Sequence, residues 1–319
     1  MNITSDMISV SIVIPVYNAE LSIGKLIDEL VSELNHKYNL EIVLVNDNST
    51  DNSEKVCISL YERYKNIINY YSLAKNVGEH NAVMAGLNNV CGEYVVIVDD
   101  DFQNPISEIK KLVSYATEKH YDVVYTYYKK KKHSLFRNLG SRFNDKVANV
   151  MLNKPEDLYL SSFKILNKFL VREIITYDLP FSYVDGLILR TTENIGKIEV
   201  EHNERESGKS GYTLRKLVSL WSNMFTNFSI LPLRISIILG FLFAIIGFLI
   251  GIQTMIEKII NPNLPVGYPS LIVITAIFAG IQLVAIGMIG EYLGRIFLSQ
   301  NKKPQYSIRR KYERIIRDV

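Results

Sequence analysis

Cysteine is scarce in this chain: only Cys57 and Cys91 occur in 319 residues, and they form neither a close-spaced pair nor a metal-binding pattern. We interpret them as ordinary buried thiols in a reducing compartment, not as part of a disulfide framework. An excess of one charge is also missing, because Lys+Arg 36 against Asp+Glu 33 leaves a net charge of +3. A balance so close to neutral does not indicate a nucleic-acid-binding protein.

Two familiar nucleotide-binding motifs are absent. The chain contains no GxxxxGK[ST] sequence and no GxGxxG sequence, so neither a P-loop nor a dinucleotide site is predicted. The segment Met1–Val10 has no basic stretch followed by an apolar one, and we therefore expect no cleaved signal peptide.

Charge is missing altogether from two long apolar runs, residues 235–256 and 270–290. Each is about the 20 residues that a helix needs to cross the hydrocarbon core of a bilayer. Two buried core helices would be the alternative, but they would need a much larger soluble shell around them. We therefore predict a transmembrane helical hairpin over residues 234–291, with a proline-rich turn between its helices.

The charges that flank the hairpin predict its orientation. Arg234 precedes the first run, the turn carries a single basic residue, Lys258, and residues 292–319 form a basic tail. The positive-inside rule then places both flanks in the cytoplasm. We expect a multi-pass protein of the inner membrane, with a cytoplasmic domain over residues 1–213, both termini cytoplasmic, and an interfacial amphipathic helix over 214–233 that contacts membrane lipids.

The region before the hairpin alternates between apolar strands and helical patterns. Strands are predicted at 10–15, 41–45, 68–72, 94–98 and 122–127, and helices at 22–34, 53–64, 79–90 and 106–119. Continuous apolar strands between helices are typical of an α/β fold with a mostly parallel sheet covered on both faces. In such sheets ligands bind outside the carboxyl ends of the strands.

Three of the predicted strand ends carry polar clusters, and the third cluster is the most informative. The first two, around residues 15–18 and 46–51, can also be solvated turns, because Asn, Asp and Ser are common turn formers. The third contains three consecutive carboxylates, whose repulsion makes sense if a divalent cation lies among them. Asp99, Asp101 and Gln103 can present oxygens to one Mg²⁺ or Mn²⁺ ion while Asp100 faces elsewhere, and a diphosphate would complete the ligand shell.

These segments resemble the successive motifs of family 2 glycosyltransferases, which have an A-type nucleotide-sugar fold. The order and spacing of several motifs make the resemblance specific, and it extends over nearly the whole chain. It is closest to the polyprenyl-phosphate branch, which includes bactoprenol and dolichol-phosphate glycosyltransferases. The motifs are SIVIPVYNAE, EIVLVNDNSTDNS, AKNVGEHNAVMAGL, GEYVVIVDDDFQNP, HNERESGKSGYTLRKL and IGMIGEYLGRIF.

The resemblance implies roles for individual residues. On the donor side, residues that match nucleotide-sugar-binding positions are Pro15, Tyr17, Asn18, Asp47, Asn76, Gly78, Asp99 and Asp100. Asp99, Asp101 and Gln103 match the metal ligands. On the acceptor side, Arg205, Lys209 and Ser210 match a loop that binds phosphate. Asp101, Asp157 and Arg205 are the expected catalytic residues, although Asp157 can also be a helix or turn cap.

The function that the resemblance implies is inverting transfer of a sugar, with UDP-sugar as the expected donor, to polyprenyl phosphate. A homo-oligomer is also implied, because relatives form tetramers. Three alternatives stay open: a processive polysaccharide synthase, a transferase acting on another membrane glycan or lipid, and a non-catalytic membrane scaffold. The synthase would need more spans and a QxxRW motif, whereas the single tryptophan, Trp221, lies in LVSLW.

Overall fold

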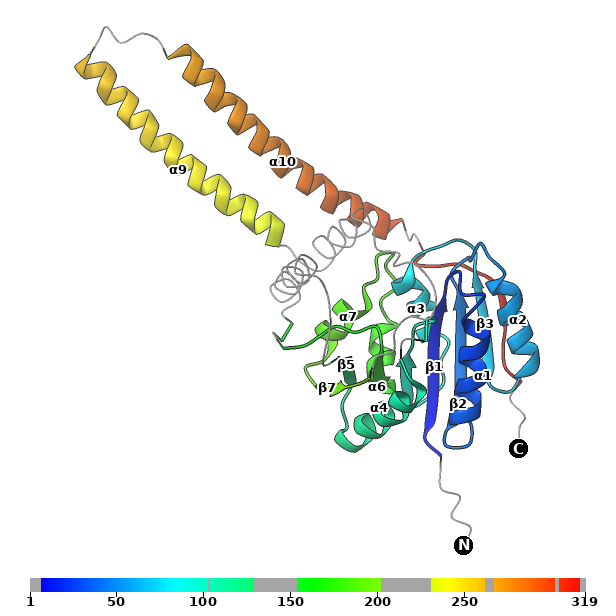
Figure 1. Cartoon of the computed structure of the whole chain (residues 1–319). Helices are drawn as coiled ribbons and strands as arrows, with labels where there is room; N and C mark the ends of the chain where they lie inside the picture. The colour runs from blue at the N-terminus through cyan, green and yellow to red at the C-terminus, as the bar shows by residue number, and fades with distance from the viewer. Residues whose placement is uncertain are drawn as a thin grey trace. The chain divides into compact units, whose positions relative to one another are not determined.

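The computed structural model of the chain describes residues 7–102, 104–128, 154–155, 157–201, 231–261, 267–301 and 304–315 (Figure 1). The chain divides into two compact units. The first comprises residues 1–212 together with 303–319, and the second comprises residues 213–302.

The first unit is an α/β domain built on one mixed sheet. In the described part of the chain this sheet has eight strands in the order β7-β5-β6-β4-β1-β2-β3-β8. Most neighbouring pairs are parallel, as the sequence predicted, whereas β6 and β8 run antiparallel to their partners. The strands are β1 (Ser9–Val16), β2 (Asn39–Asn46), β3 (Ile68–Leu73), β4 (Tyr94–Ile97), β5 (Val123–Tyr127), β6 (Lys164–Asn167), β7 (Ile195–Glu199) and β8 (Ile308–Tyr312).

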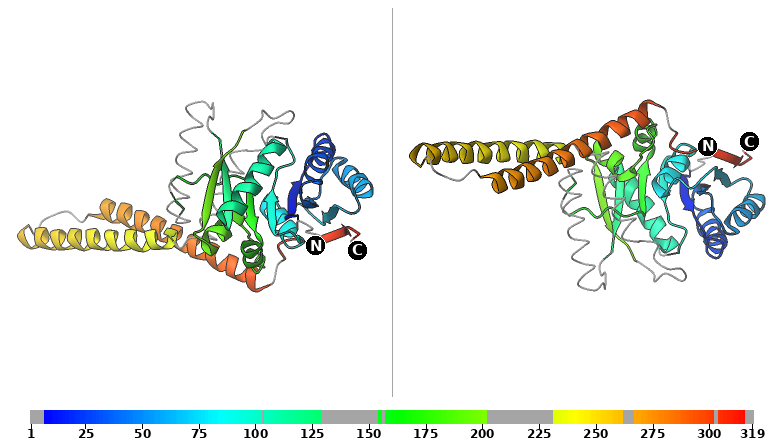
Figure 2. Two further views of the ribbon diagram at one scale, coloured as in Figure 1. Left: turned by 90° about the horizontal axis from the view of Figure 1, so that it is seen from below. Right: turned by 90° about the horizontal axis from the view of Figure 1, so that it is seen from above.

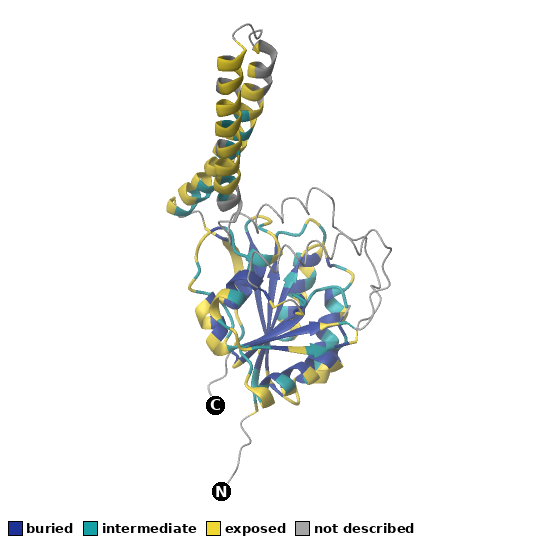
Figure 3. Cartoon of the chain, turned by 90° about the vertical axis from the view of Figure 1, so that its left-hand side faces the viewer, coloured by how far each residue is buried: buried dark blue, intermediate teal, exposed yellow. Residues whose placement is uncertain are grey.

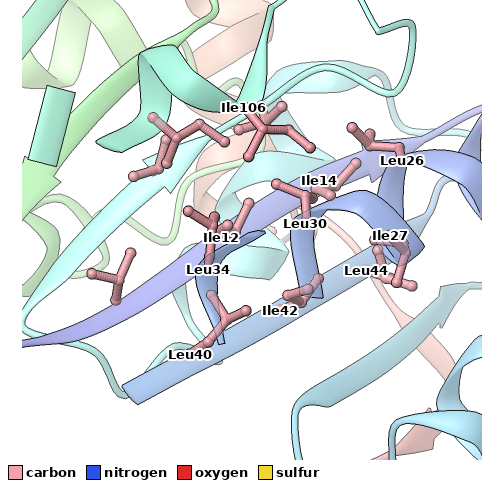
Figure 4. Close-up of a cluster of buried hydrophobic side chains, with 14 of the residues drawn as sticks. Ile12, Ile14, Leu26, Ile27, Leu30, Leu34, Leu40, Ile42, Leu44 and Ile106 are labelled. Carbon is pink, nitrogen blue, oxygen red and sulfur yellow. The ribbon is translucent and has the colours of Figure 1, made fainter. Parts of the chain in front are cut away.

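Helices cover both faces of the sheet. They are α1 (Ile23–Leu34), α2 (Ser53–Arg63), α3 (Glu79–Leu87), α4 (Ile106–Lys119), α6 (Lys168–Ile174) and α7 (Val184–Thr191). The apolar faces of α1, α2 and α4 pack on one side of the sheet, and the strands are buried between the two helical layers (Figure 3). A cluster of buried side chains joins α1 to β1 and β2 and includes Ile12, Ile14, Leu26, Leu30 and Ile42 (Figure 4).

Helix α3 packs on the opposite face at very short range. A Cβ atom at Gly86 would lie 2.4 Å from Cγ1 of Val13 in β1, so only glycine permits this approach. The close packing fixes α3, and with it the turn that precedes its first residue, against the centre of the sheet.

The segment after the second apolar run returns to the sheet as β8, which pairs antiparallel with β3. Its contacts continue beyond the strand, since Gln305 Nε2 donates to the carbonyl of Tyr177 at 2.6 Å and Arg314 forms an ion pair with buried Glu41. Residues 304–315 are therefore part of the α/β domain, a role that their basic composition did not suggest.

The second unit contains two long apolar helices, α9 (Leu231–Ile260) and α10 (Tyr268–Gln300). They run antiparallel, because Phe243 contacts Phe278 while Ser236 lies 3.7 Å from the sulfur of Met288 (Figure 2). Segments Ser236–Gln253 and Ile277–Gln300, with mean hydropathies of 2.4 and 1.6, are long and apolar enough to cross a membrane. Of the two cysteines, Cys57 is buried as expected, whereas Cys91 is exposed.

Candidate active site

The three polar clusters meet at one edge of the sheet. Strands β4, β1 and β2 are neighbours, so their carboxyl ends lie side by side. Strand β2 lies on one side of β1, and β4, which comes later in the chain, lies on the other side. Parallel sheets bind ligands in the crevice that such a reversal of strand order opens at the carboxyl ends of the strands. A hydrogen bond crosses it, from the Tyr17 N–H to Oδ2 of Asp100 at 3.1 Å.

The loops after β1 and β2 are joined by the side chain of Asn18. Its Oδ1 accepts the backbone N–H of Thr50 at 2.8 Å, and its own N–H donates to Oγ of Ser49 at 3.0 Å. Asn18 has a φ of 56°, a left-handed conformation that asparagine tolerates better than most residues. These hydrogen bonds hold the loops after β1 and β2 together. The side chain of Tyr17, in the first of these loops, is half-exposed.

Asp47, at the end of β2, organises the turn before α3. Its two carboxylate oxygens accept the N–H groups of Val77 and Gly78 at 2.7 and 2.9 Å, and Asn76 Nδ2 donates to its carbonyl at 3.3 Å. Gly78 has a φ of +87°, which favours glycine there. Burial raises the pKa of Asp47, although the two N–H groups oppose part of that rise. Asp47 thus links β2 to the Asn76–Gly78 turn.

Asp99 and Asp101 follow β4 and place two carboxylates at this edge. Oδ2 of Asp99 accepts the hydroxyl of Ser162 at 2.5 Å. In the described part of the chain no three His, Cys, Asp or Glu side chains gather as a complete cation site. Two carboxylates fit Mg²⁺ or Mn²⁺ chemically, provided that other oxygens, such as those of a diphosphate, complete the shell. The expected third ligand, Gln103, lies outside the described residues.

Negative charge accumulates beside this pair. Glu79 is the first residue of α3, and its side chain is exposed. Desolvation, followed by the negative charge of Asp99, raises the pKa of Glu79 to about 7, with smaller contributions from Asp185 and Asp100 and an opposing one from Lys164. A site with this potential favours a cation, so the electrostatics agree with the chemistry of the carboxylate pair.

A buried ion pair lies among these groups. Lys164, the first residue of β6, bonds to Asp185 of α7, and both side chains are less than one-tenth exposed. The hydroxyl of Tyr125 also donates to Oδ1 of Asp185, at 2.8 Å. Next to them the rings of His80 and Tyr183 meet edge to face, with their centroids 4.8 Å apart. Desolvation lowers the pKa of His80 to about 4. His80 is therefore neutral near pH 7.

The structure relates the remaining predicted residues to the site only in part. Asp157 is exposed and forms an ion pair with Lys197 of the edge strand β7, which lowers the pKa of the Asp157 carboxyl. Arg205, Lys209 and Ser210 lie outside the described residues, as does most of the expected interfacial helix.

Sequence reasoning did not anticipate Ser162, Lys164, Asp185 or Glu79. One signal was available: Lys164 is the only charge in the strand KILN, and a charge in a buried strand needs a partner. The identity of that partner depends on the antiparallel insertion of β6 beside β4, which no local pattern reveals.

Comparison with known proteins agrees with this architecture. Residues 11–175 match the family model described as glycosyl transferase family 2. The undecaprenyl-phosphate 4-deoxy-4-formamido-L-arabinose transferase of Photorhabdus laumondii is 34% identical over 310 residues, covering 94% of this chain and 93% of that protein. The protein of the same name from Proteus mirabilis is also 34% identical, with the same coverage.

Solved structures show the same fold at lower identity. Glucosyl-3-phosphoglycerate synthase from Mycobacterium tuberculosis, in complex with Mn²⁺, UDP-glucose and phosphoglyceric acid, superimposes with a TM-score of 0.50 and 19% identity. The match covers 68% of this chain and 79% of that one. It supports the A-type fold expected from the sequence motifs.

Proposed function

The chain belongs to glycosyl transferase family 2, and we propose that it transfers a sugar from a nucleoside diphosphate sugar to undecaprenyl phosphate. The observation that carries this proposal is the similarity to undecaprenyl-phosphate sugar transferases over 94% of the chain, including both apolar helices. A UDP-sugar is the proposed donor, and the product is a lipid-linked sugar for modifying a cell-envelope glycan.

The donor is proposed to bind at the carboxyl edge of β1, β2 and β4. Pro15, Tyr17 and Asn18 border the nucleoside on one side, and Asp47 borders it on the other together with the Asn76–Gly78 turn. This assignment is supported by the hydrogen bonds that join these segments into one rigid support. Asp100 contributes by holding the Tyr17 backbone.

Asp99 and Asp101 are proposed to hold Mg²⁺ or Mn²⁺, with Gln103 as a further ligand. When bound, the cation supplies charge stabilisation for the departing nucleoside diphosphate. The protein's task is to align the acceptor with the anomeric carbon. A phosphate monoester with a second pKa near 6 is mostly a dianion at pH 7, so its oxygen needs no strong general base. Direct displacement by that oxygen inverts the anomeric configuration.

Arg205, Lys209 and Ser210 are proposed to bind the acceptor phosphate. A guanidinium can grip a phosphate through two parallel hydrogen bonds, which suits Arg205. Asp157 is proposed to lie on the acceptor side of the site. The alternative is a structural role, in which Asp157 forms an ion pair with Lys197.

The catalytic domain and both chain termini are proposed to lie on the cytoplasmic side of the inner membrane. Strand β7 precedes the two apolar helices and β8 follows them, yet both belong to one sheet. A chain that leaves a folded sheet and returns to it crosses a membrane an even number of times. The basic residues Arg309, Arg310 and Lys311 of β8 agree with a cytoplasmic sheet.

The test of the reaction uses the full chain in membranes with undecaprenyl phosphate and a panel of nucleotide sugars. The panel includes UDP-glucose and a donor of 4-deoxy-4-formamido-L-arabinose, and the lipid product is identified by mass. We expect one donor to give a lipid-linked sugar of inverted configuration. Absence of product with every donor would favour a scaffold, and transfer only to another lipid or glycan would replace the acceptor.

The test of topology labels introduced cysteines in intact cells with an impermeant thiol reagent. The background needs only Cys91→Ser, because Cys57 is buried and its pKa is raised to about 12 by desolvation. A cysteine at Asn263 should react from outside, and one at the exposed Ser307 should not. The reverse pattern would overturn the orientation.

A further inference from the structure

A serine hydroxyl holds one of the two carboxylates assigned to the cation. Ser162 Oγ donates to Oδ2 of Asp99 at 2.5 Å, and a hydrogen bond accepted by a carboxylate is charge-assisted. We infer that Ser162 is a positioning residue that fixes the orientation in which Asp99 presents its oxygens to a divalent cation. This inference rests on the proposed function, in which Asp99 is a cation ligand.

The physical need for such a residue lies in the aspartate side chain itself. The torsion that rotates a carboxylate has a broad energy profile, so rotamer preference alone does not hold its oxygens in place. A hydrogen bond to one oxygen selects one orientation before the cation arrives. Groups that hold metal ligands in this way are worth about 10–100-fold in metal affinity or activity.

The sheet register explains why Ser162 is the residue that reaches Asp99. Strands β4 and β6 are antiparallel, and Ile97 lies opposite Lys164. Continuing this register by two residues in each direction places Asp99 opposite Ser162. Directly opposed residues in an antiparallel pair have Cβ atoms about 4.5–5.5 Å apart, within reach of a serine–aspartate hydrogen bond. The contact thus follows from strand pairing.

The residues on both sides of Ser162 are hydrogen-bonded to Thr126 of β5. The Thr126 hydroxyl donates to the Phe163 carbonyl at 2.7 Å and contacts Ser161 Oγ at 3.0 Å. Both Thr126 and Ser161 are buried. Immediately after them, Lys164 is tied to Asp185 by the buried ion pair. Ser162 therefore sits on a segment anchored before and after it, which is what a positioning residue requires.

A purely structural role for the Ser162 hydroxyl makes a different prediction. Loss of a structural hydrogen bond lowers stability and leaves cation affinity unchanged, whereas loss of a positioning bond weakens cation binding as well. Ser162→Ala removes the hydroxyl and Ser162→Thr keeps it. Ser182→Ala is a matched control, because Ser182 is also half-buried and its hydroxyl donates to Oδ1 of Asn81 at the same 2.5 Å.

The experiment titrates Mn²⁺ into the detergent-purified full chain with UDP present, and follows free Mn²⁺ by electron paramagnetic resonance. We expect Ser162→Ala to remain folded and to bind Mn²⁺ about 10–100-fold more weakly than the wild type. Ser162→Thr and Ser182→Ala should bind like the wild type. Wild-type affinity in Ser162→Ala, or an equal loss in Ser182→Ala, would overturn the inference.

The outcome also separates this inference from the proposed reaction. If the wild type binds Mn²⁺ but transfers no sugar from any donor, the reaction assignment fails while the Ser162 comparison still decides the positioning role. If the wild type binds no Mn²⁺ even with UDP present, the positioning role fails, because Asp99 is then not a cation ligand.

Discussion

Replacing Arg314 with methionine should destabilise the α/β domain even though this residue follows both apolar helices in the chain. Arg314 Nη2 lies 3.3 Å from Oε1 of Glu41, and the two side chains are 18% and 2% exposed. The Glu41 carboxylate also accepts from the Ser11 hydroxyl, from Asn69 Nδ2 at 3.0 Å and from the Cys91 N–H at 2.8 Å. Arg314 supplies the cation of this buried network.

The size of the effect follows from what remains after the substitution. Leaving a buried charge without its partner costs roughly 3–5 kcal/mol, and one hydrogen bond to a charged group contributes about 1.5–3 kcal/mol. Because three neutral donors still hold Glu41, we expect the lower range, about 2 kcal/mol. For a domain of this size that corresponds to a melting temperature lower by about 4–8 °C.

The assay is thermal unfolding of the full chain in detergent, with Arg310→Met as the matched control. Arg310 lies in the same segment, but its ion pair with Glu54 is exposed, with side chains 57% and 36% accessible. Exposed pairs contribute about 0–1 kcal/mol and are screened by salt, so the control should move little and only at low salt. Equal shifts in the two variants would refute the reasoning that Arg314 neutralises a buried carboxylate.

Three further outcomes are expected. Asp101→Asn should lower the rate of sugar transfer by about 100-fold or more, because it removes a charged cation ligand, and it should leave the melting temperature unchanged. Near-normal turnover of the wild type in the presence of a chelator would exclude a catalytic cation. His80→Gln should reduce the stability that the protein loses as the pH falls from 6.5 to about 4. Folding lowers the pKa of half-buried His80, so in this range the unfolded chain binds a proton that the folded chain does not, and acid favours unfolding; an unchanged dependence of the melting temperature on pH would contradict this. Arg205→Lys should cut transfer to lipid phosphate by about 10–100-fold and weaken UDP binding less, as separate assays of the two would show.

The central strands and their carboxyl-end clusters could be predicted from sequence because each signal is local. A run such as YVVIV is apolar throughout, which is typical of a strand buried on both faces, and all four of its residues in β4 are buried. Asp99 and Asp101 follow directly, so the strand itself indicates where they lie. Because ligands of such sheets bind at this edge, the residues of the candidate site could be predicted without knowing any long-range contact.

Strand β8 was not predictable in the same way. Its sequence IRRKY contains three basic residues, a composition that marks a solvated tail more often than a strand. Charged side chains are nevertheless typical of edge strands, where they discourage pairing with another chain. The partner of β8 is β3, which lies more than two hundred residues earlier, so no local pattern could have paired them.

The antiparallel strands extend the rule that located the site. In a parallel sheet the carboxyl ends of the strands carry the ligand-binding residues. An antiparallel strand brings its amino end to that same edge, so the residues just before it also reach the ligand side. Ser162, which precedes β6 and bonds to Asp99, is one such residue. Ser307 precedes β8, and its carbonyl accepts the N–H of Ala74, two residues before Asn76. In a mixed sheet of this kind, residues that precede antiparallel strands are therefore candidate site residues as well. The strand order places them at the same edge of the sheet even when their own sequence shows nothing unusual.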